Sequence, residues 1–124
     1  PATKRRNRMT RALLVLLLIG GVATAHAAGP MKFWNLTKYT VEHLYLAPAG
    51  TDHWTKDQCT NDPDKSVDPD ERLRLTDVQP GRYDVKLSDV KGRTCLVHNV
   101  QLNGGKAYAF ALSESDLKSC STSG

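Results

Sequence analysis

The chain has 124 residues and carries 17 Lys and Arg against 13 Asp and Glu, a formal net charge of +4. Five of the 17 basic residues lie within residues 1–27, which hold no acidic residue, so residues 28–124 carry 12 basic and 13 acidic residues, a net charge of −1. Because residues 28–124 are nearly neutral, the charge gives no reason to expect nucleic-acid binding. The length allows one domain with one modest core and excludes a multidomain enzyme.

A targeting signal occupies the start of the chain. Residues 12–23 form the apolar run ALLVLLLIGGVA, which follows a basic stretch and precedes Ala-His-Ala at 25–27. These three parts are typical of a secretory signal peptide, so residues 1–27 are predicted to be removed by cleavage after Ala27. The alternative is an uncleaved membrane anchor, although the run is shorter than the roughly 18 to 20 apolar residues that span a bilayer. Met9 is a candidate start after an upstream extension. We expect a periplasmic or secreted protein.

The mature part shows the period of β-strands. Residues 82–88 alternate polar and apolar side chains, with Tyr83, Val85 and Leu87 on the predicted core face. Asn103-Gly104 is a hairpin signal between the last two strands. No helical run of ten or more residues is apparent, so the sequence predicts an all-β fold, a small antiparallel β-sandwich of about six strands. The expected elements are strands at 32–37, 40–47, 72–76, 82–88, 94–102 and 106–112 and a helical turn at 114–119, in one domain spanning 28–120 before a disordered tail at 121–124.

Two parts of the chain carry a resemblance to known modules. Residues 75–87, LTDVQPGRYDVKL, followed by Gly92 and by NVQL at 99–102, resemble the hairpins of prealbumin-like and carboxypeptidase-regulatory-like β-sandwich modules. The segment from Phe33 to Pro48, followed by Trp54, resembles small exported bacterial proteins of unknown function. The resemblance implies a secreted Ig-like or prealbumin-like sandwich, and it carries no catalytic residue to transfer.

Three cysteines lie in the mature part, Cys59, Cys95 and Cys120. An exported compartment permits disulfides, so one pair and one free thiol are expected. The preferred pair is Cys59–Cys120, which would close a loop of about 60 residues and stabilise the fold by about 4 kcal/mol in the chain-entropy model. Cys95 lies in a predicted strand, where a free thiol packs as a small apolar side chain. Pairing of Cys95 with Cys120 stays open.

The most unusual segment is an acidic loop at residues 52–71, which holds seven carboxylates and two lysines. Four of the carboxylates are spaced like the third, fifth, ninth and twelfth ligand positions of a calcium loop. Thr60 and Lys65 depart from that pattern, because they stand where Asp and Gly belong. The loop is either a solvated acidic segment or a calcium site, and the ligands of that calcium site would be Asp62, Asp64, Asp68 and Glu71.

Other chemistry-bearing residues form no recognisable motif. The mature histidines, His43, His53 and His98, fit no local metal-ligand spacing, and no Gly-x-Ser-x-Gly elbow is present. Trp54 is expected in the core, where it would anchor the long loop. The glycosylation sequon that begins at Asn35 falls in a predicted strand, so we take it as incidental.

These observations predict an exported, non-catalytic binding module with no cofactor, for a protein or peptide of the cell envelope. The contact would use a sheet edge, or the acidic loop at 52–71 against a basic partner. A calcium- or metal-stabilised domain is the first alternative and a small hydrolase the second.

Overall fold

The computed structural model describes residues 29–123, so the predicted signal peptide and its cleavage site lie outside the described residues. The described part is all-β, with seven strands and two short 3-10 helices. It contains no helix long and apolar enough to cross a membrane. The elements in chain order are β1 (Lys32–Leu36), β2 (Val41–Pro48), η1 (Gln58–Asn61), β3 (Arg72–Arg74), β4 (Gly81–Asp89), β5 (Arg93–Leu102), β6 (Phe110–Ser113), η2 (Glu114–Asp116) and β7 (Cys120–Thr122).

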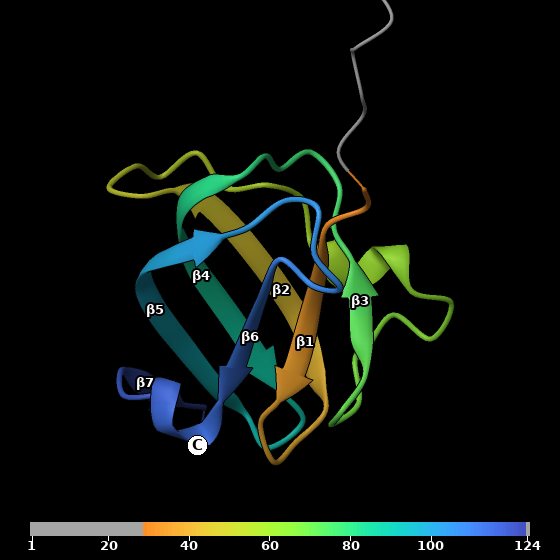
Figure 1. Cartoon of the computed structure of the whole chain (residues 1–124). Helices are drawn as coiled ribbons and strands as arrows, with labels where there is room; N and C mark the ends of the chain where they lie inside the picture. The colour runs from red at the N-terminus through yellow and green to blue at the C-terminus, as the bar shows by residue number, and fades with distance from the viewer. Residues whose placement is uncertain (1–28, 124) are drawn as a thin grey trace, which may run out of the picture.

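The strands form two sheets that enclose the core between them (Figure 1). The three-stranded sheet has the order β3-β1-β6, and the four-stranded sheet has the order β2-β4-β5-β7. Alternating side chains of both sheets point inward, as the period of two requires. The all-β sandwich predicted from the sequence is therefore confirmed. The largest fully buried apolar side chains are Phe33, Leu44, Leu46, Leu87, Leu102, Val41, Val67 and Val85.

The last long strand does not form the expected hairpin. Strand β5 ends at Leu102, residues 103–109 form a loop, and β6 pairs with β1 of the other sheet. The pairing is parallel, with Phe33 opposite Phe110, so the sandwich is not purely antiparallel. The rings of these two residues pack with centroids 5.0 Å apart in the core. The prediction from Asn103-Gly104 was wrong because burial of the following apolar side chains in the other sheet outweighs a local turn preference.

The C-terminal segment is ordered as a strand. β7 pairs antiparallel with the start of β5, with Arg93 opposite Thr122 and Cys95 opposite Cys120. The backbone N–H of Ser123 donates to the carbonyl of Gly92 at 2.9 Å. The expected disordered tail is therefore wrong for residues 121–123, because strand pairing holds the tail against β5.

The disulfide joins Cys95 to Cys120, and Cys59 is free and buried. The expected Cys59–Cys120 pair is wrong because β7 places Cys120 directly opposite Cys95, with Cα atoms 4.0 Å apart. Cys59 instead lies on η1 against the core, where its Sγ approaches the carbonyl of Val41 at 3.7 Å. Burial raises the pKa of the Cys59 thiol to about 12, and the nearby Asp57 carboxylate adds to the rise. A disulfide is consistent with an oxidising, exported location.

Candidate functional site

The acidic loop uses its carboxylates to hold its own backbone. Asp62 accepts a hydrogen bond from the N–H of Asp64 at 2.8 Å, and Glu71 accepts one from the N–H of Asp68 at 2.8 Å. Asp68 accepts a third from the hydroxyl of Thr40 at 2.8 Å. The first of these bonds is that of an Asx turn, and the other two tie the loop to itself and to Thr40, so all three shape the loop without a ligand.

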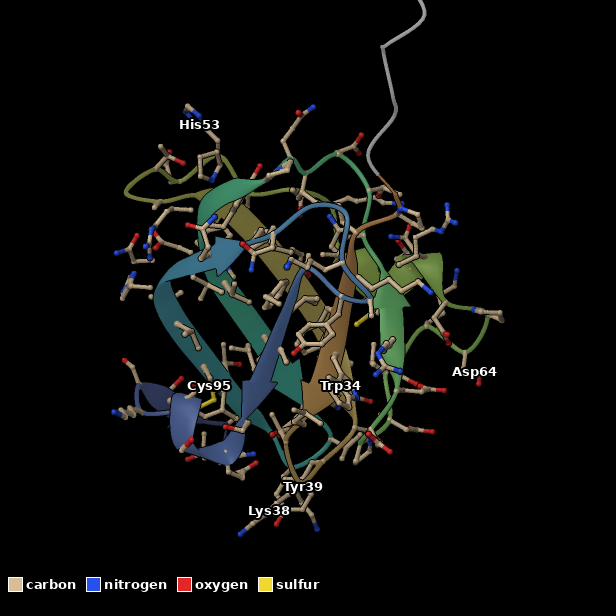
Figure 2. The ribbon with its side chains drawn as sticks, viewed as in Figure 1. Trp34, Lys38, Tyr39, His53, Asp64 and Cys95 are labelled. Carbon is tan, nitrogen blue, oxygen red and sulfur yellow. A yellow bond between two sulfur atoms is a disulfide. The ribbon has the colours of Figure 1, made fainter. Side chains whose placement is uncertain are left out.

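The four proposed calcium ligands do not converge. Figure 2 shows the side chain of Asp64 at the far end of the loop, away from the sandwich. Within residues 29–123, no three His, Cys, Asp or Glu side chains form a group that could hold a metal ion. The spacing of Asp62, Asp64, Asp68 and Glu71 along the chain therefore does not become a ligand set in space.

Asn35 ties the acidic loop to the sandwich. Its side-chain amide donates to the carbonyls of Tyr39 at 3.0 Å and Val67 at 2.9 Å. Its side-chain oxygen accepts from both the N–H and the hydroxyl of Thr37. Because the side chain is fully buried and its amide nitrogen is occupied, the folded protein leaves no room for a glycan at this sequon.

Both histidines on the outer face of the four-stranded sheet are bonded to carboxylates. His43 Nδ1 lies 2.6 Å from Asp57, and His98 Nδ1 lies 3.3 Å from Asp84. Burial acts to raise the pKa of Asp57, but hydrogen bonds from His43 and from the backbone N–H groups of Leu44 and Cys59 outweigh it, so the pKa is lowered.

Asp84 is fixed in a similar way. The backbone N–H groups of Asn99 and Gly50 donate to its carboxylate, and they lower its pKa against the opposing effect of burial. The alternation of residues 82–88 predicts that Asp84, between the core-facing Tyr83 and Val85, faces water; this is wrong, because Asp84 lies at a bulge in the β4–β5 pairing and is buried.

Lys86 on this face is also engaged, by aromatic rings. Lys86 Nζ lies 5.2 Å from the ring centroid of Tyr45 and 4.7 Å from that of Trp54. Trp54 is half-buried on the outside of the sheet, not in the core as expected. The polar and charged groups described on this face are thus largely satisfied by one another.

The outer face of the three-stranded sheet gathers basic and aromatic side chains. In the β1–β3 register, Lys32 lies opposite Arg74 and Trp34 opposite Arg72, while Phe33 between them is buried. Lys32, Trp34, Arg72 and Arg74 therefore share the outward side of the sheet, with Trp34 in front of β1 in Figure 2. We call these four residues together with Tyr108 the aromatic–basic face.

Trp34 is the centre of this face. Its indole N–H donates to the carboxylate of Asp70 at 3.0 Å, and its ring lies 5.1 Å from that of Tyr108. The guanidinium of Arg72 lies 4.2 Å from the indole centroid. Within residues 29–123, none of Lys32, Arg72 and Arg74 forms an ion pair. The face thus presents three cations that have no ion-pair partner in the described part of the chain.

A cavity of about 400 Å³ adjoins this face at the loop between β5 and β6. It is lined by Asn103, Lys106, Ala107 and Tyr108. Tyr108 belongs to both the cavity and the aromatic–basic face, and 37% of its surface is exposed. An ammonium, an amide and a phenol surround a partly apolar space, a composition that suits small ligands with an anionic group.

Sequence reasoning missed the aromatic–basic face. Arg72 and Arg74 alternate with the buried Leu73, which is a signal that the arginines face outward. The pairing of their strand with that of Trp34 is a long-range contact that no local pattern encodes. No family model, curated protein or solved structure matches the chain. The geometry of the aromatic–basic face suits binding of an anion by positioned cations.

Proposed function

We propose that this chain is an exported, non-catalytic binding module with an Ig-like or prealbumin-like sandwich, and that it binds an acidic segment of a protein or peptide of the cell envelope. The aromatic–basic face is the binding surface. The observation that carries the proposal is the guanidinium of Arg72 stacked on Trp34, beside two further cations that have no carboxylate partner in residues 29–123. The leader at residues 1–27 and the disulfide support export.

Stacking on the indole prepares Arg72 for a carboxylate. A guanidinium has a planar fork of N–H donors that matches a carboxylate in two parallel hydrogen bonds. Resting on an aromatic ring fixes the plane of that fork, so less side-chain entropy is lost when a ligand binds. Lys32 and Arg74 lie opposite each other, two residues along the strands from the pair of Trp34 and Arg72. The three cations therefore lie together on one face, a grouping suited to several carboxylates.

The other surfaces are less suited to this role. On the four-stranded sheet, Lys86 is held by two aromatic rings and both histidines by carboxylates. In the acidic loop, Asp62, Asp68 and Glu71 accept hydrogen bonds from the chain itself. At the histidines or in the acidic loop a ligand would have to displace existing hydrogen bonds, whereas the aromatic–basic face offers three cations with no ion-pair partner in residues 29–123.

Fluorescence anisotropy with a labelled oligoglutamate peptide tests the proposal. We expect oligoglutamate to bind, labelled oligolysine not to bind, and rising salt to weaken the complex because exposed charges are screened. The double variant Arg72→Gln/Arg74→Gln should lose affinity by about ten-fold. The matched control Arg82→Gln/Lys118→Gln removes the same charge from exposed positions away from this face and should bind as the parent does.

Two results would overturn the proposal. Equal loss of affinity in both double variants would mean that net charge, not this face, governs binding. Binding of dextran sulfate with no binding of oligoglutamate would assign the face to an anionic polysaccharide and remove the peptide partner.

A further inference from the structure

The loop between β5 and β6, next to the aromatic–basic face, is held in place by backbone hydrogen bonds. Its ends are held by the N–H of Asn103, which donates to the carbonyl of Ala109 at 3.0 Å, and by the N–H of Ala109, which donates to the carbonyl of Lys32 at 2.7 Å. Gly105 has a φ of +69°, a conformation that a glycine adopts without strain. In Figure 1 the loop passes beside the start of β1 before it returns to β6. The cavity lined by this loop is therefore anchored directly to the sheet.

The chemistry of the cavity combines an anion receptor with an apolar wall. Lys106 supplies an ammonium and Asn103 an amide donor, while Ala107 and the ring of Tyr108 supply apolar surface. The only ion pairs in residues 29–123 involve other side chains, so Lys106 has no carboxylate partner there. The cavity has a volume of about 400 Å³, which exceeds what a carboxylate alone would fill. A ligand that uses both features carries a carboxylate on a side-chain-sized apolar group.

We propose that this cavity is an anchoring subsite for the C-terminal residue of a peptide, with the terminal carboxylate at Lys106 and Asn103 and an apolar or aromatic last side chain against Tyr108. The proposal rests on the proposed function, because it places the end of the same peptide. Tyr108 connects the subsite to the face, since its ring packs against Trp34. A peptide anchored here leaves the cavity past Tyr108 and meets Arg72 with its preceding acidic residues.

The test compares two oligoglutamate peptides that both end in Phe, one with a free terminal carboxylate and one with a terminal carboxamide. We expect the parent protein to prefer the free acid by about five-fold, because one exposed charge-assisted contact is lost in the amide. Lys106→Gln should remove this preference and leave the amide peptide bound as before. The matched control Lys118→Gln, also an exposed lysine, should keep the preference.

The outcomes separate the subsite from the proposed function. If both peptides bind the parent protein equally, the subsite is wrong while the aromatic–basic face stands. If neither peptide binds, the proposed function fails as well. If an oligogalacturonate displaces the free-acid peptide and binds more tightly than it does, the cavity takes an acidic sugar and the C-terminal assignment is overturned.

Discussion

The guanidinium of Arg72 lies 4.2 Å from the centroid of the Trp34 ring, on the outside of the three-stranded sheet. The same indole donates its N–H to Asp70, so the platform beneath the arginine is fixed from its edge. Asp70 has a positive φ of 69°, and the carbonyl of Asn35 accepts its backbone N–H at 2.6 Å. Asp70 and Arg72 form no ion pair within residues 29–123. The donor fork of Arg72 therefore stays available for a ligand.

Replacing the indole ring of Trp34 without changing the charge of the face should weaken binding. Trp34→Leu keeps Arg72 but removes the ring beneath it, so the affinity for oligoglutamate should fall by about two- to five-fold. Trp54→Leu is the control, because Trp54 lies in the loop after β2 and packs beside Lys86 of the other sheet. Anisotropy titrations of both variants measure the effect. A larger loss in the Trp54 variant would contradict the assignment of the binding face.

The pairing of the cysteines gives a prediction of both stability and reactivity. Cys95→Ser/Cys120→Ser should lower the free energy of unfolding by about 3 kcal/mol, because the disulfide closes a loop of 25 residues in the unfolded chain. Urea unfolding measures this loss. Without reductant, a thiol reagent should label no cysteine in the native protein and one, Cys59, after unfolding. Rapid native labelling, or labelling of Cys95, would contradict the pairing.

The lowered pKa of Glu114 predicts a loss of stability at low pH. Its hydrogen bonds from Arg93, with a further one from the N–H of Lys38, lower its pKa from 4.5 to about 2 against the effect of burial. A carboxylate with a lowered pKa contributes stability above its ordinary pKa, and this contribution is lost as the pH falls from about 4.5 toward 2.

Glu114→Gln should therefore lower the stability at neutral pH and flatten its decline across that acid range. The expected cost is about 1 to 3 kcal/mol, since the change breaks charge-assisted bonds to Arg93. Thermal unfolding from pH 2 to pH 7 measures it, with Glu42→Gln, at an exposed position, as the control. An unchanged pH profile in the Glu114 variant would rule out this account.

Asn35 should be the most sensitive polar position near the acidic loop. Asn35→Ala leaves the carbonyl of Val67 without its side-chain donor and removes the acceptor of Thr37, which should cost about 3 kcal/mol. Asn103→Ala changes an exposed asparagine and should alter stability by less than about 0.5 kcal/mol. Urea unfolding of the two variants compares them, and equal stabilities would show that Asn35 does not hold the loop.

Local patterns in the sequence predicted the strands but not their partners. The alternation around Val85 and Leu87 places both side chains in the core, as expected. The Asn103-Gly104 signal failed because the fate of the following strand depends on the packing of Phe110 against Phe33, a contact between distant parts of the chain.

Unknown strand partners also explain why the disulfide was predicted wrongly and the aromatic–basic face was missed. The choice between Cys59 and Cys95 as partner of Cys120 was decided by the pairing of β7 with β5, which the polar C-terminal sequence did not suggest. The aromatic–basic face was missed because Trp34 and Arg72 meet only through strand pairing. The sequence of each strand shows its charged residues and the alternation of its side chains. It does not show which strand lies beside it or in which register.

The most direct test uses the two tryptophans of the chain, Trp34 in the three-stranded sheet and Trp54 in a loop that packs beside Lys86 of the four-stranded sheet. Each gives one indole N–H signal in a proton–nitrogen correlation spectrum, and Trp34→Leu and Trp54→Leu assign them. On titration with oligoglutamate, the Trp34 signal should shift in a saturable way while the Trp54 signal stays in place, and Arg72→Gln should reduce the shift. A saturable shift of Trp54 with Trp34 unmoved would contradict the claim that the aromatic–basic face binds the acidic ligand.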